Sequence, residues 1–224
     1  MRTAVGPIVA LAVSLLLASW VLAPDAIDVA ESRAASVTTT ACGVASGTSG
    51  SAVLIEEGRA LTAAHTVIGA GSVEVDFGGV TRTAEIIGLN PRSDLALLEV
   101  PGIAAREVLL GEAEAGQQVT YVNGSGDVQT AEVTRRVEIR IEEERSTVRS
   151  SRFGFEIDTS VELGDSGAGV FDDRGRLIGV IFGVSLSRDD RSFAVRTQEI
   201  TELLDTPEER FLCNPLDDRV RPAE

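Results

Sequence analysis

The sequence contains one histidine, two cysteines and no lysine among its 224 residues. A structural zinc site needs several cysteine or histidine ligands, so this composition disfavours a metal centre of that kind. The formal net charge is −15, which disfavours nucleic acid and anionic lipid as partners. All 20 basic residues are arginine, and we interpret the absence of lysine as a compositional bias without a mechanistic role.

Long hydrophobic runs are confined to the start of the chain. Arg2 precedes an apolar run over 4–23, and acidic residues follow it. A run of about 20 apolar residues can span a bilayer, and its basic end is expected to stay in the cytoplasm. A cleaved signal peptide is the alternative, although Pro24 should hinder cleavage. We therefore predict a signal anchor or transmembrane helix over 1–24. It would hold the chain on the outer side of the cell membrane, or the chain would be secreted if the signal is cleaved.

Residues 25–41 are rich in Ala, Ser, Thr and Asp, and this composition predicts a flexible tether. Cys42 and Cys213 bound the region that follows, which we take as the folded domain. In an exported protein, two cysteines more often form a disulfide than stay free. We therefore expect a disulfide between them, with residues 214–224 as a C-terminal tail.

From Ser51 onward the pattern is typical of an all-β domain. Short apolar or alternating runs are separated by glycine, asparagine or proline turns. Residues 102–116 have the composition of a crossing between two halves. Near the end, 197–204 predicts a short helix, with Thr197 as its N-cap and its apolar residues on one face.

The stretch 162–169, Glu-Leu-Gly-Asp-Ser-Gly-Ala-Gly, is a candidate nucleophile site. Flanking glycines allow Ser166 to stand on a tight turn where successive backbone N–H groups point at one spot. A nucleophilic serine needs such a turn, because N–H donors must hold the oxyanion that its attack creates. Glycine–serine turns are common in β-proteins, and the assignment therefore depends on a base and an acid elsewhere.

His65 is the only histidine available as the base. A lone histidine is more often a surface or core residue, but here it follows a strand-like run and small residues that allow close packing. Asp94 is the candidate acid, because it opens an otherwise apolar strand. Most aspartates at such a place are turn or cap residues. The three residues nevertheless occur in the order His65, Asp94, Ser166.

Three motifs in this order, Thr-Ala-Ala-His, Asp-Leu-Ala-Leu-Leu and Gly-Asp-Ser-Gly, resemble the signatures of the trypsin-like (chymotrypsin-fold) serine proteases. The compact spacing is similar to HtrA-related members. The chain also resembles actinobacterial membrane-anchored periplasmic proteases of the acid-resistance (MarP-like) type, in the cysteine at each end of the domain and in the Gly-Val-Ile-Phe-Gly run. The resemblance covers roughly residues 42–213. It implies two six-stranded β-barrels, about 42–112 and about 116–200, with a short C-terminal helix.

The resemblance also implies a function for individual residues. His65, Asp94 and Ser166 would form the catalytic triad, and the backbone N–H groups of Gly164 and Ser166 would form the oxyanion hole. The chain would then hydrolyse peptide bonds in proteins or peptides through an acyl-enzyme, with no metal or organic cofactor. Processing of envelope proteins or a stress response is the expected setting.

Substrate preference rests on four residues. Ser160 resembles the residue at the base of the pocket for the side chain before the cut, and because it is not acidic, cleavage after Lys or Arg is disfavoured. Phe182, Gly183 and Val184 resemble the strand edge that pairs with an extended substrate. Phe182 and Val184 would favour small or medium apolar side chains; the alternative is that both fill the core of the second barrel.

Two departures from the family pattern bear on activity. Ala168 stands where the family usually has glycine, and its methyl group could close the oxyanion region. A non-catalytic or latent binding module on a protease fold is therefore the alternative function. Asp165 pairs in digestive relatives with a new N-terminus, and the sequence shows no obvious activation cleavage signal.

The charge-dense stretch 138–152 is interpreted as a solvated edge, with a regulatory or substrate-guiding role as the alternative.

Overall fold

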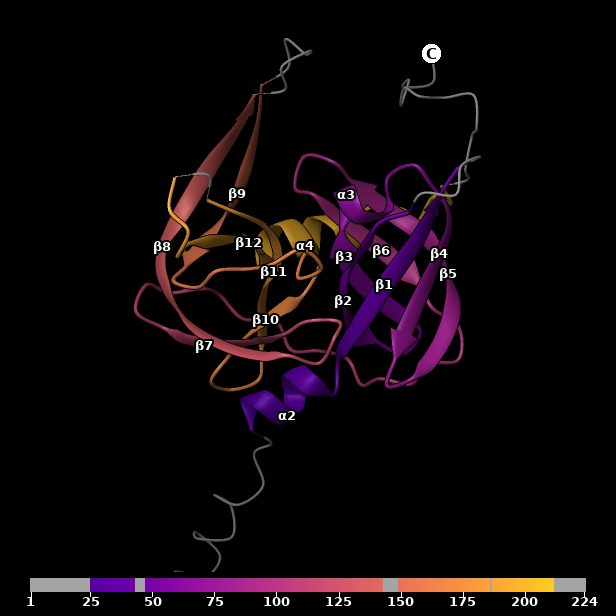
Figure 1. Ribbon diagram of the computed structural model, residues 1–224, viewed down its shortest axis with the longest axis horizontal. Coiled ribbons are helices and arrows are strands. Elements are labelled where there is room, and N and C mark those ends of the chain that lie inside the picture. The colour runs from indigo at the N-terminus through magenta and orange to yellow at the C-terminus, as the bar shows by residue number, and fades with distance from the viewer. Residues whose placement is uncertain (1–24, 43–46, 143–148, 186, 212–224) are drawn as a thin grey trace, which may run out of the picture.

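The computed structural model describes residues 25–42, 47–142, 149–185 and 187–211, and side chains within 140–150 are not described. The described chain forms two closed six-stranded β-barrels and short helices (Figure 1). The prediction of an all-β fold with two six-stranded barrels and a short C-terminal helix is therefore confirmed. The predicted helix over 1–24 lies outside the described residues. Within them, no helix has the length and apolar character needed to cross a membrane.

The first barrel is built from the N-terminal half of the chain. Its strands follow one another around the barrel in the order β1-β2-β3-β6-β5-β4, all neighbours antiparallel. A single helical turn, α3 (Ala64–Val67), leaves the end of β3. The strands are β1 (Ala34–Ala41), β2 (Ser49–Glu56), β3 (Arg59–Ala63), β4 (Ala70–Phe77), β5 (Val80–Asn90) and β6 (Leu95–Glu99).

The second barrel repeats this antiparallel arrangement in the order β10-β11-β12-β9-β8-β7. Its β8–β9 hairpin extends beyond the barrel on the side where α3 lies (Figure 1). The strands are β7 (Gln118–Val122), β8 (Val128–Glu142), β9 (Arg149–Ile157), β10 (Gly169–Asp172), β11 (Leu177–Val184) and β12 (Ser192–Arg196).

The prediction of a flexible tether over 25–41 is wrong. Asp25 caps a short helix, α2 (Ala26–Glu31), by accepting a hydrogen bond from the Ile27 N–H. The next residues form β1, which closes the first barrel between β2 and β4. Alternate residues of β1, among them Val37, are buried, which is the period-2 pattern of a strand with one face on a core. The composition hid this strand because its inward residues are small, and the barrel therefore begins at Ala34 rather than at position 42.

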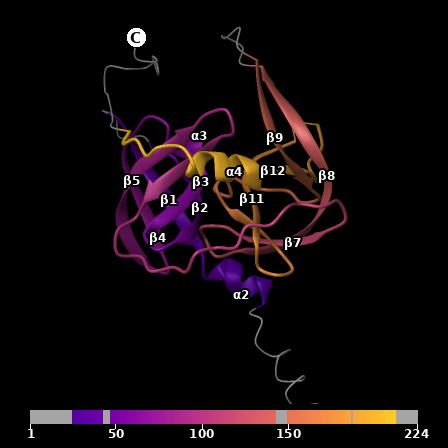
Figure 2. The ribbon, with the colours of Figure 1, turned by 180° about the vertical axis from the view of Figure 1, so that it is seen from behind.

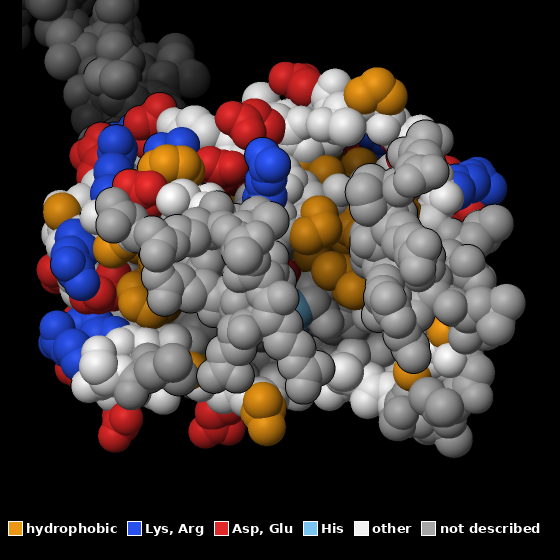
Figure 3. All heavy atoms as spheres, turned by 90° about the horizontal axis from the view of Figure 1, so that it is seen from above, with side chains coloured by type: hydrophobic (Ala, Val, Ile, Leu, Met, Phe, Trp, Pro, Cys, Tyr) orange, Lys and Arg blue, Asp and Glu red, His pale blue; other side chains and the backbone are white. Residues whose placement is uncertain are grey.

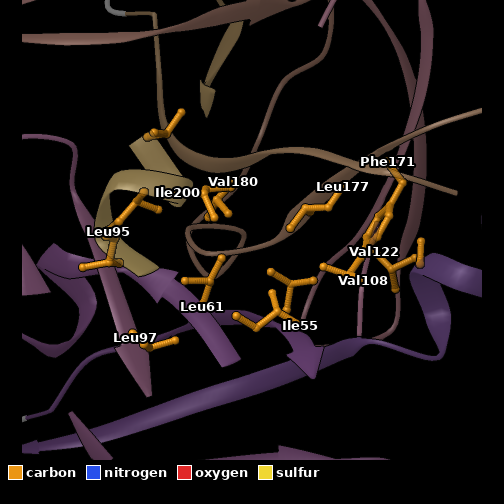
Figure 4. Close-up of a cluster of buried hydrophobic side chains, with 14 of the residues drawn as sticks. Ile55, Leu61, Leu95, Leu97, Val108, Val122, Phe171, Leu177, Val180 and Ile200 are labelled. Carbon is orange, nitrogen blue, oxygen red and sulfur yellow. The ribbon is translucent and has the colours of Figure 1, made fainter. Parts of the chain in front are cut away.

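A hydrophobic core between the barrels fixes their relative position. Its members come from both barrels: Leu61 and Leu95 from the first, Phe171 and Leu177 from the second (Figure 4). Separate cores fill each barrel. Each fully buried side chain of this size contributes about 1.5–3 kcal/mol from burial. Residues on the two barrels can therefore form one site.

Helix α4 (Thr197–Leu204) confirms the predicted C-terminal helix and lies across the junction of the two barrels (Figure 2). It buries Ile200 and Leu203 in the core between the barrels. The prediction of Thr197 as N-cap is wrong, because the helix already begins at Thr197 and Arg196 precedes it without a side-chain cap. The Thr197 hydroxyl instead donates to the Gly111 carbonyl at 2.7 Å, in the segment that crosses between the barrels.

Only one of the two cysteines lies within the described residues. Cys42 directly follows β1, and no cysteine within the described residues is free. Cys213 lies outside the described residues, so its pairing with Cys42 stays a prediction.

Candidate active site

His65 lies in the first turn after β3, where the chain enters α3. The preceding Ala63 and Ala64 are fully buried, and their small side chains let this turn pack against the start of β6. The Ala64 N–H donates to the Asp94 carbonyl at 2.9 Å. The imidazole itself is half exposed, with 50% of its side chain accessible. Figure 3 looks onto this face and shows the histidine colour set back beside hydrophobic side chains.

Asp94 lies immediately before β6 and contacts His65 through both of its carboxylate oxygens. One carboxylate oxygen accepts the His65 backbone N–H at 2.8 Å, and the other lies 2.7 Å from the imidazole Nδ1. Only 6% of the Asp94 side chain is exposed. Because an ionised carboxylate can only accept hydrogen bonds, we assign the proton to Nδ1. The other ring nitrogen, Nε2, is then unprotonated and able to act as a base.

The backbone of Asp94 has φ +59°, and it is the only described non-glycine residue with positive φ. Aspartate and asparagine tolerate this left-handed conformation better than most residues. Here the conformation lets the Asp94 carbonyl and carboxylate both face the chain at 64–65. The unusual backbone therefore serves the contact with His65.

Ser166 stands on the tight turn between β9 and β10. Gly164 and Gly167 take φ values of +108° and +97°, which L side chains rarely adopt. The Gly167 N–H donates to the Ile181 carbonyl of β11 at 2.8 Å. Ser166 is partly exposed, and its hydroxyl has no hydrogen-bond partner among the described residues. The N–H groups of Gly164 and Ser166 likewise donate to no described residue.

Gly50 brings the serine and histidine segments together. A Cβ atom added at Gly50 would lie 2.8 Å from Thr66 Cγ2 and 2.9 Å from the Ser166 carbonyl oxygen. Thr66 is the neighbour of His65, so the two segments meet at this glycine. The next residue, Ser51, donates its N–H to the Ser166 carbonyl at 2.8 Å. The structure thus brings the histidine, aspartate and serine segments, predicted from three separate motifs, to one place between the barrels.

Sequence reasoning missed the residues that hold the serine turn. The Ser51 hydroxyl donates to the Gly164 carbonyl at 2.6 Å and accepts the Gly124 N–H at 2.7 Å. The Asn123 side-chain amide donates to the buried Asp165 carboxylate at 2.8 Å. Asp165 accepts a second hydrogen bond, from the Glu162 N–H at 3.0 Å. Ser51 lies in β2 and Asn123 in an ordinary turn after β7, and no local motif marks either residue, because their role depends on contacts with distant segments.

Asn123→Asp should lower kcat/KM by about tenfold, because it replaces the amide donor facing Asp165 with a second carboxylate. A hydrogen bond to a charged group contributes about 1.5–3 kcal/mol, and two facing carboxylates repel one another. The turn itself should persist, since the Asn123 side-chain oxygen that accepts two backbone N–H groups is retained in aspartate. Steady-state kinetics on a peptide substrate would measure the effect, with Ser125→Ala in the same turn as control. Equal kinetics for both variants would contradict the role of Asn123.

Ala168 does not obstruct the serine turn. It is fully buried and belongs to the hydrophobic core of the second barrel, with neighbours such as Val170 and Ile181. Its N–H donates to the Asp165 carbonyl at 3.0 Å, so the turn closes normally. The extra methyl group therefore adds to the core, and the expectation that it could close the oxyanion region finds no support in this packing.

The four predicted substrate-binding residues have different surroundings. Ser160 is exposed after the end of β9. Phe182 is partly buried against the core between the barrels and stacks on Phe193, with ring centroids 6.2 Å apart. Val184 is 47% exposed, and a Cβ added at Gly183 would meet no atom within 4 Å. Phe182 thus serves partly as core, whereas Gly183 and Val184 border open space.

The edge of β11 is open next to the serine turn. On one side β11 pairs with β12 along 179–184, but on the other side its pairing with β10 covers only 177–180. Beyond the hydrogen bonds of Ile181 with the serine turn, the described residues leave this edge unpaired. An extended peptide could add there as another strand.

As for metals, the described part of the chain holds no cluster of three or more potential ligands.

Comparison with known proteins supports this reading of the motifs. The chain is 27% identical over 158 residues to the serine protease Rv3671c of Mycobacterium tuberculosis, covering 67% of this chain and 40% of that protein. It is 32% identical over 167 residues to the chloroplastic Protease Do-like 2 of Arabidopsis thaliana, covering 69% and 27%. The chain thus spans less than half the length of these curated relatives.

Among solved structures, the crystal structure of the active form of the Rv3671c protease aligns with a TM-score of 0.73. The alignment covers 87% of this chain and 91% of that chain at 22% identity, and it supports the two-barrel fold. The family model of the trypsin-like peptidase domain matches residues 50–180, a range that contains His65, Asp94 and Ser166. The chain belongs to the trypsin-like peptidase family.

Proposed function

We propose that this chain is a serine endopeptidase in which Ser166 is the nucleophile, His65 the general base and Asp94 the residue that orients the base. The observation that carries the proposal is the paired contact of Asp94 with the His65 N–H and with Nδ1. This pair leaves Nε2 free to take a proton. Ser166 stands on a glycine turn whose carbonyl approaches Gly50, as does Thr66, the neighbour of His65. Family membership and the protease relatives add support.

The reaction follows from these groups. His65 Nε2 takes the Ser166 hydroxyl proton as Oγ attacks the peptide carbonyl carbon, and the N–H groups of Gly164 and Ser166 stabilise the oxyanion. The imidazolium then gives its proton to the leaving amine as the C–N bond breaks, which leaves an acyl-enzyme on Ser166. Water, deprotonated by the same nitrogen, attacks the ester and releases the acid. Asp94 stays ionised and holds the imidazole throughout.

Substrates in this proposal are proteins or peptides in extended form. The open edge at 182–184 supports strand addition, and Gly183 leaves room for the substrate backbone. Ser160 supplies no negative charge, so small or medium apolar side chains before the cut are preferred over Lys and Arg.

The proposed location is outside the cytoplasm, either anchored in the cell membrane through residues 1–24 or secreted after cleavage. The apolar run at the start of the sequence and the use of two cysteines support it. A disulfide between Cys42 and Cys213 would tie the first strand of the first barrel to the tail. Processing of envelope proteins, or their removal under stress, is the corresponding role.

Cleavage of a peptide library by the full-length chain in detergent tests this function. The wild type should cut after apolar residues, and Ser166→Ala should reduce the rate by at least about 10³-fold without changing Tm. Equal rates for wild type and Ser166→Ala would refute Ser166 as the nucleophile. A folded wild type that cuts nothing would favour a binding module on the protease fold.

A further inference from the structure

Arg152 belongs to the second barrel, yet its side chain contacts the first. It lies on β9, and its guanidinium reaches the turn that precedes β6. Only 13% of the side chain is exposed. The sequence placed Arg152 at the end of a charge-dense stretch interpreted as a solvated edge, and for this residue the interpretation is wrong.

All three guanidinium nitrogens have partners in that turn. Nη1 donates to Asp94 Oδ2 at 3.3 Å, the same oxygen that contacts His65 Nδ1. Nε donates to the Arg92 carbonyl at 3.1 Å, and Nη2 makes a longer contact of 3.5 Å with the Pro91 carbonyl. The guanidinium carbon lies 4.7 Å from the centre of the Phe182 ring. The planar group is therefore fixed on one side by the turn and on its face by an aromatic ring.

The positive charge of Arg152 compensates the negative charge of the buried Asp94 carboxylate. Asp94 is buried, and a buried carboxylate is costly unless an opposite charge and hydrogen bonds compensate it. Of the described residues, only His65 and Arg152 are titratable groups hydrogen-bonded to Asp94, and the imidazole is neutral in the resting state of the proposed mechanism. Burial lowers the pKa of Arg152 and the Asp94 carboxylate opposes that shift, so the guanidinium stays charged.

We infer that Arg152 is a positioning residue for the triad, which holds the Asp94 carboxylate aimed at His65 and offsets its charge across the boundary between the barrels. This inference rests on the proposed function. One side chain of the second barrel would then set the orientation of Asp94 and His65, which belong to the first barrel. It also implies that a small displacement of β9 is transmitted to Asp94, since the same guanidinium holds Pro91, Arg92 and Asp94.

The test uses Arg152→Gln and Arg152→Lys in the full-length chain, with pH profiles of kcat/KM and separate kcat and KM on a peptide substrate. Arg152→Gln should lower kcat by about tenfold to a hundredfold with little change in KM, because the base is misaligned. It should also move the acidic limb of the profile up by about one pH unit, since the imidazolium then faces an Asp94 charge that no cation offsets. Arg152→Lys keeps the charge, so it should restore the position of the limb but only part of kcat.

Arg136→Gln is the matched control, because Arg136 also bridges a carbonyl and a carboxylate, those of Ala113 and Glu112, away from the triad. It should leave kcat, KM and the acidic limb unchanged. A loss of activity in Arg152→Gln with an unmoved acidic limb, or with a limb that Arg152→Lys fails to restore, would overturn the inference and leave a structural role. An inactive but folded wild type would instead refute the proposed function.

Discussion

Asp94→Asn should lower kcat by about 10⁴-fold while the chain still folds. The asparagine amide would present an N–H to the imidazole in place of a carboxylate oxygen, so Nδ1 must accept and Nε2 must carry the proton. The base of the proposed mechanism is then protonated where it should receive the Ser166 proton. Folding should survive, because asparagine tolerates the left-handed backbone at φ +59° and its oxygen can still accept the His65 N–H.

Single-turnover kinetics and thermal unfolding of the same preparation would measure this prediction. Asp76→Asn is the matched control, since Asp76 also accepts a backbone N–H and a second side-chain donor, but on β4 beside the exposed turn to β5. The control should keep its activity. If Asp94→Asn retained activity within tenfold of wild type at an unchanged Tm, Asp94 would not orient the base.

Gly167→Ala should destabilise the chain by about 3 kcal/mol or more, because two costs combine at this position. The backbone has φ +97°, where a side chain is strained, and an added Cβ would collide with the Ser51 carbonyl and lie 2.6 Å from Thr62 Oγ1. Both atoms belong to buried strands of the first barrel, so neither can move aside easily. In thermal unfolding the expected loss corresponds to about 6–12 °C in Tm.

Gly116→Ala is the control that separates the backbone strain of a positive φ from the steric collision of an added Cβ. Gly116 has φ +83°, and an added Cβ there would meet no atom within 4 Å. Only the conformational strain remains, so we expect a loss of about 1 kcal/mol. Two variants of equal stability would show that the contact between the serine turn and the first barrel is looser than the structure describes.

The catalytic motifs and the two barrels could be predicted from the sequence because their signals are local. Each of His65, Asp94 and Ser166 lies in a short motif, and glycine turns separate the strands. The family resemblance then supplied the arrangement of barrels that no single motif contains. The structure confirms the barrels and brings the three motifs together.

The remaining features escaped prediction for physical reasons. Strand β1 carries small inward residues, so its composition resembled a linker although barrel closure buries Val37 completely. Asn123 and Arg152 act on residues that lie far away in the sequence. The folding of the second barrel brings Asn123 to Asp165, whereas Arg152 reaches Asp94 only because one barrel packs against the other. A charged residue at the end of a charge-dense stretch gives no sign that its side chain turns inward.

Covalent labelling of Ser166 tests the central claim most directly. The full-length chain, in detergent and under oxidising conditions, would be treated with a fluorophosphonate probe and its intact mass recorded beside Ser166→Ala. We expect one adduct on the wild type, located on Ser166 by peptide mapping, and none on the variant. A folded wild type that gains no adduct, or a variant labelled equally, would contradict a triad of His65, Asp94 and Ser166.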